Sequence, residues 1–449
     1  MKHKQTAKVP TSRLSRFSSL GGLASRLAGN VLVEGAKRLS QGQKPSLNEL
    51  VMTPSNITHM ADKLAELRGA AMKVGQMLSM DSGELLPKEL SDILSRLRSD
   101  AKAMPHKQLV TLLKTNWGND WLDPFAHFEL NPFAAASIGQ VHLATLASGE
   151  KLAVKLQYPG IRNSIDSDID NVAAILKLSK LIPSNVQFDQ LLAEAKKQLH
   201  VEADYQNELS MLQRFQSLIA NNEINADEFI VPTTYPVLCN QNILVMEFID
   251  GQSIESINTL EQVTRNNIAT RLLKLFFKEL FAFKLMQTDP NFANYQYQAE
   301  SDKLVLLDFG ATRAIPSALS DQYKQLMAAS IINDRKTMEN AAQNIGFFQD
   351  AITKEQKSLV LDIFYLACEP LRFEGDYDFS DNTLAKRIKQ AGMAMSTDRN
   401  EWHSPPADAI FIHRKLAGLY LLASKIGAKV NVKQLFEAQL QASPFTIDT

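Results

Sequence analysis

The spacing of apolar residues predicts helices over much of the chain. Apolar side chains that recur three and four positions apart lie on one face of a helix. The series Leu64, Leu67, Ala71, Val74 and Leu78 follows this spacing. In the first half of the chain, the helices predicted in this way cover residues 47–105, 106–128, 163–182 and 188–220.

Short runs in which apolar and polar residues alternate predict strands between these helices. Such runs cover residues 137–146 and 151–157, and the intervening Ala147-Ser148-Gly149-Glu150 predicts a hairpin turn. Two more short strands are predicted at 229–236 and 242–248. From residue 259 onward the pattern is helical except for one strand-like stretch at 295–307. A strand-rich part with inserted helices is therefore followed by a mostly helical part.

The composition is that of an ordinary folded protein. The chain has 449 residues, of which 45% are hydrophobic and 22% charged, enough for two or three packed subdomains. The net charge of −1 argues against nucleic acid as a partner. The two cysteines, Cys239 and Cys368, argue for a reducing compartment and against a disulfide or zinc framework. No apolar run approaches the roughly 20 residues that a membrane-spanning helix needs.

The first 44 residues differ from the rest in charge. They contain nine basic residues and a single acidic residue, Glu34. Apolar residues recur at spacings of three and four from Leu14 to Val31. One interpretation is a basic amphipathic helix on an anionic membrane surface. Two others stay open: a tail or helix that packs on its own domain, and a mitochondrial presequence, which is rich in Arg and Ser.

Three polar residues in the second half form a pattern used for phosphoryl transfer. Asp289 and Asn294 lie five positions apart in a loop that follows a long amphipathic helix. In kinases, such an Asp accepts the proton of the attacking hydroxyl, and the Asn binds Mg²⁺. Asp308 begins an Asp-Phe-Gly sequence after an apolar run, where its carboxylate can hold the metal that bridges the phosphates. Each of these two motifs alone is weak evidence, but the Asp–Asn pair followed by Asp-Phe-Gly predicts a magnesium–nucleotide site.

Lys155 lies in a predicted strand, 152–156, that resembles the kinase strand with the phosphate-binding lysine. The alternation puts Ala153 and Lys155 on one face, where a small residue suits adenine and the ammonium group can reach the phosphates. The alternative is an edge strand with a solvated lysine. By position alone, the adenine contacts are expected at the backbone of Met246, Glu247 and Phe248.

A carboxylate on a downstream helix positions the lysine in kinases. The helix predicted at 188–220 carries several acidic residues. The candidates are Glu194, Glu202, Asp204 and Glu208. Spacing alone does not select the partner of Lys155.

Two features differ from ordinary protein kinases. In place of Gly-x-Gly-x-x-Gly, the chain has Ala134-Ala135-Ala136-Ser137-Ile138-Gly139. The helical region before it contains Lys73-Val74-Gly75-Gln76. Together with Glu202-Ala203-Asp204 and Asp308-Phe309-Gly310, these motifs resemble the UbiB atypical kinase family, from about Lys8 to the C-terminus. That family includes the bacterial aarF proteins and the mitochondrial kinase-like proteins of coenzyme Q biosynthesis.

The resemblance implies roles that spacing does not show. The helix with the Lys-x-Gly-Gln motif folds over the cleft where a protein kinase binds its substrate, and the Glu-x-Asp pair holds it there. The residues with this regulatory role are Lys73, Gln76, Glu202 and Asp204. Glu208 then becomes the expected partner of Lys155.

The alanine loop is expected to contact the nucleotide. Its residues are Ala134, Ala135, Ala136 and Ser137. Alanine carries a Cβ atom, which disfavours the backbone conformations that glycine permits around phosphates. Phosphate closure and nucleotide selectivity should therefore differ from those of protein kinases.

We therefore expect an α+β, bilobal protein-kinase-like fold with an N-terminal helical extension and a mostly helical C-lobe. The expected segments are a basic amphipathic segment (1–46), a helical extension (47–128), an N-lobe with inserted helices (129–248) and a C-lobe (249–449).

The resemblance implies an atypical kinase or ATPase that uses ATP and Mg²⁺ and supports ubiquinone biosynthesis at a membrane surface. Its expected partners are a lipid or quinone precursor, an anionic membrane and enzymes of ubiquinone biosynthesis. The expected location is the cytoplasm, peripheral on the inner membrane, with the mitochondrial matrix as the alternative. A rival function is a non-catalytic, nucleotide-dependent lipid-binding or scaffold protein. An aminoglycoside-type phosphotransferase is disfavoured, because those enzymes have Asp-x-Asp where this chain has Asp-Phe-Gly.

Overall fold

The structure is a computed structural model. It describes residues 13–41, 43, 46, 50, 53–82, 103–179, 182, 188–221, 227–348, 352–381, 383–396 and 406–442. The chain divides into two compact units, of which the first contains Met1–Ser210 and Thr233–Phe248 and the second Met211–Pro232 and Ile249–Thr449. Helix α9 (Tyr205–Asn221) begins in the first unit and ends in the second. The four segments expected from the sequence are a finer division, and their boundaries stay a prediction.

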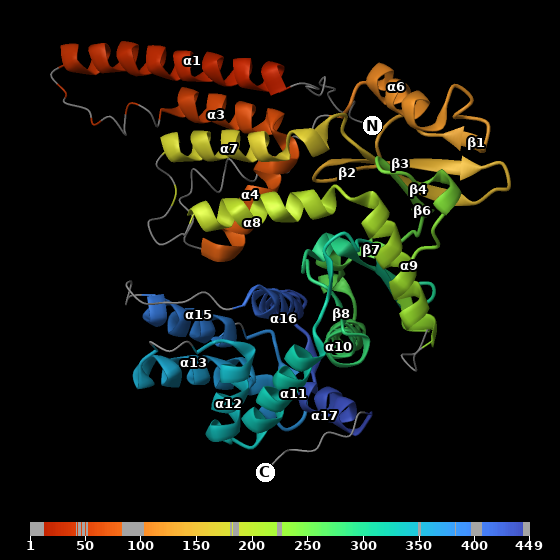
Figure 1. Ribbon diagram of the computed structural model, residues 1–449, viewed down its shortest axis with the longest axis vertical. Helices are drawn as coiled ribbons and strands as arrows, with labels where there is room; N and C mark the ends of the chain where they lie inside the picture. Colours follow the sequence, from red (N-terminus) through yellow and green to blue (C-terminus); the bar gives the residue numbers. More distant parts are fainter. Residues whose placement is uncertain are drawn as a thin grey trace. The chain divides into compact units, whose positions relative to one another are not determined.

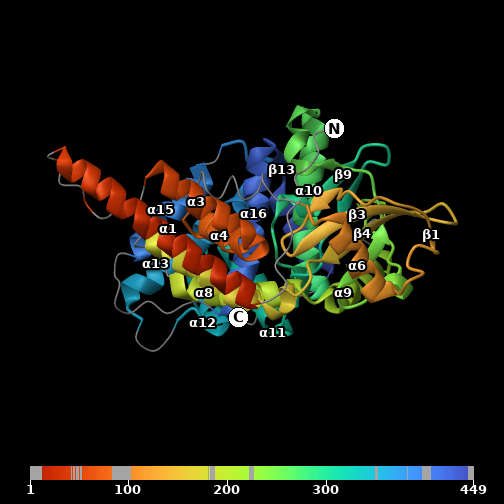
Figure 2. The ribbon, with the colours of Figure 1, turned by 90° about the horizontal axis from the view of Figure 1, so that it is seen from above.

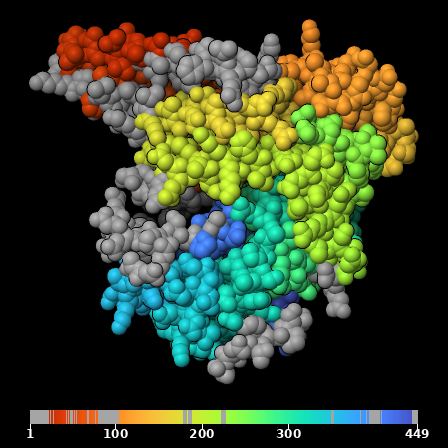
Figure 3. Space-filling model, in the orientation of Figure 1, coloured from red at the N-terminus to blue at the C-terminus, as the bar shows by residue number. Residues whose placement is uncertain are grey.

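Helices form one part of the first unit. They are α1 (Arg13–Ser40), α3 (Pro54–Glu66), α4 (Arg68–Ser82), α7 (Ile165–Ser179) and α8 (Phe188–Glu202). Both ribbon views show α1 along α3 and α7 (Figure 1 and Figure 2), and α4 packs against α7 and α8. In the space-filling view, α7 and α8 form one continuous surface (Figure 3). The apolar series predicted from Leu64 to Leu78 is buried.

An antiparallel sheet forms the other part of the first unit. Its strands are β1 (Phe125–Phe128), β2 (Ala134–Ala135), β3 (Gly139–Leu146), β4 (Lys151–Gln157) and β6 (Ile243–Glu247). They pair in the order β1-β3-β4-β6, with β2 on β3. The predicted strands at 137–146, 151–157 and 242–248 are confirmed as β3, β4 and β6. Gly149 takes a φ of 103° in the hairpin turn, which glycine adopts without strain.

The helix predicted at 106–128 is wrong in its second half. Helix α6 (His106–Trp117) ends at Gly118, whose φ of 90° stops the helix. The following Phe125–Phe128 pairs with β3 as strand β1. Aromatic residues pack well on a pleated surface, and the Phe125 ring lies 5.5 Å from the Trp117 ring.

The helix predicted at 188–220 is two helices, α8 and α9. The chain breaks between them at Ala203 and Asp204. The Asp204 carboxylate accepts a hydrogen bond from the Asn207 N–H at 3.1 Å, which caps the start of α9. The break puts Glu202 at the end of one helix and Glu208 in the first turn of the next.

The second unit contains a small sheet with the strand order β5-β10-β9-β7. The strands are β5 (Phe229–Ile230), β7 (Gln252–Ser253), β9 (Tyr295–Gln298) and β10 (Lys303–Leu306). The stretch predicted at 295–307 is thus the hairpin β9–β10, whereas the strand predicted at 229–236 is only two residues long. Strand β8 (Leu285–Gln287) pairs with β11 (Thr312–Ala314), and β12 (Tyr377–Asp378) with β13 (Lys429–Val430).

Helices make up most of the second unit. They are α10 (Gln262–Lys278), α11 (Ser317–Ile331), α12 (Arg335–Ile345), α13 (Lys354–Ala367), α14 (Glu369–Arg372), α15 (Thr383–Ser396), α16 (Ala407–Lys425) and α17 (Val432–Ala442). Helix α10 packs against α16 and α17 and continues into a π-helical turn, Glu279–Phe283. The turn ends at Lys284 in the left-handed conformation, after which β8 leads into the segment with Asp289.

Candidate nucleotide and metal site

Lys155 forms an ion pair with Glu208 in the first unit. The Lys155 Nζ atom lies 2.8 Å and 3.0 Å from the two carboxylate oxygens of Glu208. The Glu208 side chain is only 1% exposed, and the Lys155 side chain is 14% exposed. The ammonium group also lies 5.2 Å from the centre of the Tyr205 ring. Of the four acidic candidates, the structure therefore brings Glu208 to Lys155.

The sheet and helix α9 explain why these two side chains meet. Leu152, Val154 and Leu156 are fully buried on one face of β4, so Ala153 and Lys155 lie on the other face. Glu208 lies in the first turn of α9, where the partial positive charge of the helix end favours a carboxylate.

Lys73 forms a second buried ion pair in the same unit. Its Nζ atom lies 2.5 Å from Glu202, and its side chain is 4% exposed. The other oxygen of Glu202 accepts a hydrogen bond from the Ser137 hydroxyl at 2.7 Å. Glu202 thus joins the Lys-x-Gly-Gln helix, α4, to the end of the alanine loop. Asp204 caps α9 instead, and Gln76 lies in α4 with its side chain outside the described part of the chain.

The alanine loop is folded back on itself. Ala134 and Ala135 form the short strand β2, which pairs with β3. The Ala136 N–H donates to the Gly139 carbonyl at 3.0 Å, so this N–H does not face outward as it does in a glycine-rich phosphate loop. A Cβ atom on Gly69 of α4 would clash with the Ser137 backbone oxygen, so α4 and the loop are in direct contact.

The residues expected to contact adenine lie at the end of β6. Met246 is buried, and the N–H groups of Glu247 and Phe248 donate to the carbonyls of Thr233 and Lys151 at 2.8 Å and 2.9 Å. These two N–H groups are therefore engaged within the sheet. An adenine contact at this strand end has to use other groups.

Asp289 and Asn294 are hydrogen-bonded to each other in the second unit. The side-chain N–H₂ group of Asn294 donates to the Asp289 backbone oxygen and to its Oδ2 atom, both at 3.3 Å. Asn294 is 8% exposed. The carbonyl of Asn294 accepts from the Leu307 N–H at 3.0 Å, which places Asn294 next to the residue before Asp308. The hairpin β9–β10 thus brings the Asn and the second Asp to one end of the sheet.

The Asp-Phe-Gly segment is anchored on both sides of Asp308. The Asp308 Oδ1 atom accepts from the Gly310 N–H at 3.0 Å. Phe309 is 1% exposed, and its ring lies 4.9 Å from that of Phe215 in α9. The Thr288 hydroxyl and N–H both donate to the Ala311 carbonyl, which ties this segment to the residue before Asp289.

This donor set fits Mg²⁺, a hard cation that binds oxygen and is usually held by one or two protein groups plus phosphates and water. Asn294 uses its N–H₂ group for Asp289 and leaves its amide oxygen for a cation. The described residues contain no group of three or more His, Cys, Asp or Glu side chains that could hold a metal ion. An all-protein metal cage is thus not formed there.

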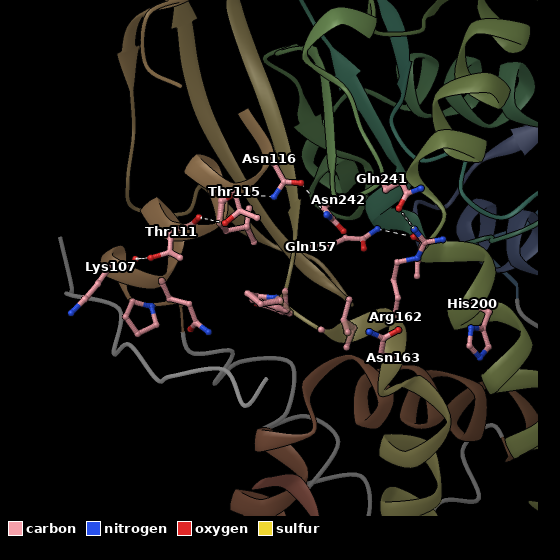
Figure 4. A pocket seen from close by; sticks show the side chains of 18 residues that line it. Lys107, Thr111, Thr115, Asn116, Gln157, Arg162, Asn163, His200, Gln241 and Asn242 are labelled. Atoms are coloured by element: carbon pink, nitrogen blue, oxygen red, sulfur yellow. Dashed lines mark hydrogen bonds between the residues drawn. The ribbon is translucent and has the colours of Figure 1, made fainter. Parts of the chain in front are cut away.

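A separate cavity of about 1160 Å³ lies in the first unit (Figure 4). Helix α6, the 157–163 segment and the residues before β6 line it, and Lys107 and Arg162 reach it from two sides. None of the residues expected to bind nucleotide or metal lines this cavity.

The buried lysine–glutamate pair beside a small antiparallel sheet, and the Asp–Asn pair next to Asp-Phe-Gly, define the class of kinase-like proteins. Residues 96–342 match the ABC1 atypical kinase-like domain family, and the chain belongs to this family. The expected UbiB/aarF membership, the α+β bilobal kinase-like fold and the enzyme class of atypical kinase are confirmed.

Several of the relatives that the chain resembles are named as mitochondrial atypical kinases. It is 35% identical to "Atypical kinase COQ8, mitochondrial" of Saccharomyces cerevisiae, over 96% of this chain and 86% of the relative. It is 37% identical to "Atypical kinase COQ8B, mitochondrial" of Rattus norvegicus, over 96% and 81%. The solved structure of the Rv3197–erythromycin complex from Mycobacterium tuberculosis matches with a TM-score of 0.59 at 23% identity, over 84% of this chain and 93% of that chain. This last likeness concerns the fold alone.

Sequence reasoning missed two features around the site. One is the contact between Gly69 and the alanine loop, for which a glycine in a helix is a weak signal. The other is a buried charged cluster behind the Asp289 segment, which includes Glu279 and Lys415. A carboxylate inside the apolar run Phe276–Phe283 was its signal in the sequence.

Proposed function

We propose that this protein binds ATP with Mg²⁺ and acts as an ATPase or small-molecule kinase that supports ubiquinone biosynthesis at a membrane surface. The observation that carries the proposal is the Lys155–Glu208 ion pair, because it has the composition and burial of the pair that positions phosphates in kinases. The names of the relatives, COQ8 and COQ8B, agree with a role in coenzyme Q biosynthesis.

Each site residue has a proposed role. Lys155 holds the α- and β-phosphates, Asn294 and Asp308 bind the metal, and Asp289 accepts a proton or orients water. Mg²⁺ neutralises the charge that develops on the transferred phosphoryl group. The buried Lys73–Glu202 pair holds α4 against the alanine loop, which restricts what can enter.

Helix α1 supports the membrane part of the proposal. Leu32 and Val33 are exposed by 73% and 71%, and Lys37 lies one turn after Val33 on the same helix. Exposed apolar groups next to basic side chains suit an anionic lipid surface. No helix in the described ranges is long and apolar enough to cross a membrane. The proposed location is the surface of the inner membrane, and the relatives' names favour the mitochondrial one.

The test is ATP turnover, with ADP release as the signal. It is measured with Mg²⁺, with or without anionic vesicles of phosphatidylglycerol and cardiolipin, and with a prenylated phenol as the quinone-precursor mimic. Asp308→Asn should lower turnover roughly 100-fold, because it removes a charged metal ligand. The matched control Asp321→Asn changes an exposed residue of α11 and should leave turnover unchanged. Equal rates for wild type and Asp308→Asn would refute the assignment.

The Lys73–Glu202–Ser137 contacts favour one second candidate, a nucleotide-dependent lipid-binding or scaffold protein without turnover. These contacts hold α4 on the alanine loop, where a bound nucleotide can alter them. Under this reading, nucleotide binding persists in the same assay while ADP release is absent.

A further inference from the structure

A buried lysine of helix α16 lies directly behind the Asp289–Asn294 segment. Lys415 is 2% exposed and its Nζ atom donates to the Gln287 side-chain oxygen at 2.9 Å and contacts the Tyr295 hydroxyl at 2.6 Å. The Glu279 carboxylate lies 3.6 Å away and is 1% exposed. Lys415 thus contacts one acceptor on each of three different elements: the π-helical turn, β8 and β9.

The partners of Lys415 flank the segment that carries the proposed chemistry. Gln287 precedes Asp289 by two residues, and its side-chain N–H₂ group donates to the Asp289 carbonyl at 2.9 Å. Tyr295 directly follows Asn294 and also donates to the Gln287 side-chain oxygen at 3.3 Å. One ammonium group therefore connects both ends of the segment.

A second contact packs helix α16 closely against the Asp289–Asn294 segment. Gly418 lies three residues after Lys415, on the same face of α16. A Cβ atom there would clash with the ring of Pro290, so only glycine allows this approach. Helix α16 therefore supports the residue next to Asp289 by packing, as well as by hydrogen bonds.

A buried ammonium–carboxylate pair is a poor source of stability. Desolvation of the two charges roughly cancels their attraction, and apolar replacements of similar size are often as stable. The charged cluster of Lys415 and Glu279 is better explained by a role in fixing the geometry of the Asp289–Asn294 segment. Because the Asp289 carbonyl accepts from both Gln287 and Asn294, a shift of Gln287 would disturb both the proposed base and the proposed metal ligand.

We propose that Lys415 is a positioning residue, which through Gln287 and Tyr295 sets the geometry of Asp289 and Asn294 for metal binding and phosphoryl transfer. The inference rests on the proposed function. It adds a residue about 100 positions after the Asp-Phe-Gly motif, outside every motif discussed above.

The test is the double variant Lys415→Met/Glu279→Gln, which removes both charges together and so avoids an unpaired buried carboxylate. We expect a thermal midpoint close to that of the wild type. We expect kcat to fall about 10- to 100-fold and the Mg²⁺ concentration for half-maximal turnover to rise by a similar factor, with KM for ATP within about twofold, as for other residues that support metal ligands. The control Lys324→Met removes another buried lysine of the same unit and should change neither kcat nor the Mg²⁺ dependence.

The outcomes separate this inference from the proposed function. If the wild type turns over ATP and the double variant keeps its kcat and Mg²⁺ dependence, the inference is wrong and the proposed function stands. If the wild type does not turn over ATP, the proposed function fails. The role of Lys415 is then tested by binding of a fluorescent ATP analogue at increasing Mg²⁺. The Mg²⁺ concentration for half-maximal binding must be about 10-fold or more higher for the double variant than for the wild type. If the double variant does not fold, Lys415→Gln alone is compared by the same two readouts.

Discussion

At the scale of single residues, buried charges lie beside the proposed site residues within each unit. In the first unit, Glu208 is almost fully buried and meets Lys155 and the Tyr205 ring. A buried carboxylate without its cation is costly, since neither water nor another charge compensates it. Loss of the Lys155 cation should therefore lower the stability of the first unit, whether or not nucleotide is bound.

Lys155→Met should destabilise the first unit by about 3 kcal/mol, because it leaves Glu208 as an unpaired buried charge. Adding Glu208→Gln to the same chain should recover most of this loss. The measurement is urea unfolding followed by tryptophan fluorescence, since Trp117 and Trp121 both lie in the first unit.

Lys151→Met is the matched control for this prediction. It makes the same substitution at the exposed start of the same strand, and its effect should stay within about 0.5 kcal/mol. A loss for Lys155→Met no larger than for Lys151→Met would show that the pair is not important for stability.

Much of this site could be predicted from the sequence, because its chemistry depends on charged residues at particular spacings. Alternation along β4 indicated the face that Lys155 shares with Ala153. Spacing could not choose among the four carboxylates, since the choice depends on a helix break at Ala203 and Asp204, and only the family resemblance pointed to Glu208. The resemblance gave Glu202 and Asp204 one shared role at the Lys73 helix, whereas in the structure Glu202 alone meets Lys73 and Asp204 caps α9.

At the scale of elements, the contact between α4 and the alanine loop is the feature that periodicity could not predict. Periodicity predicted that α4 has an apolar stripe, and Val74 and Leu78 are indeed buried. It says nothing about which element covers the opposite face. Gly69 and Lys73 are also buried, because the alanine loop and Glu202 lie against them.

Gly69→Ala should destabilise the first unit by about 1–3 kcal/mol, although alanine is the better helix former. The added methyl group meets the Ser137 backbone, which cannot rotate away as a side chain would, and overpacking of this kind carries that cost. Chemical unfolding measures the difference.

The comparison for this prediction is Gly29→Ala in α1, where a Cβ atom has no neighbour within 4 Å. Helix propensity then acts alone and should stabilise by up to about 1 kcal/mol. Opposite signs for the two substitutions are required. If Gly69→Ala also stabilised the protein, the tight contact of α4 with the loop would be disproved.

At the scale of the whole molecule, each unit contains a histidine that resists protonation, buried in the case of His142 and half-buried in the case of His413. Burial lowers the pKa of His142 in the first unit and of His413 in the second to about 4. His142 contacts the Glu129 carbonyl and Gln140, whereas His413 contacts the Tyr323 hydroxyl and stacks on Phe347. In the unfolded chain both have a pKa near 6.5, so the unfolded state binds more protons between pH 6.5 and 4.

This difference in bound protons between the folded and unfolded states sets the direction in which stability changes with pH. The contribution of each histidine to stability is complete above about pH 6.5 and is lost as the pH falls toward 4, by up to about 3 kcal/mol each. Glu279 acts in the opposite direction in the second unit, since burial raises its pKa to about 7 and its contribution is lost as the pH rises. Two variants therefore have to be compared to separate the contribution of His413 to the pH dependence of stability from that of Glu279.

We predict that Tyr323→Phe/His413→Phe loses about 2.5 kcal/mol less stability between pH 7.5 and 4.5 than Tyr323→Phe alone, because only the latter keeps a titrating histidine. Both variants lack the Tyr323 hydroxyl, so its lost hydrogen bond cancels in the difference, and the phenylalanine ring can occupy the cage of Phe347 and Phe364. Hydrogen exchange of the α16 amides, measured across this pH range, reports the opening free energy of the second unit. Identical pH dependence in the two variants would mean that His413 is protonated at its ordinary pKa in the folded protein, and that burial does not control the acid sensitivity of this unit.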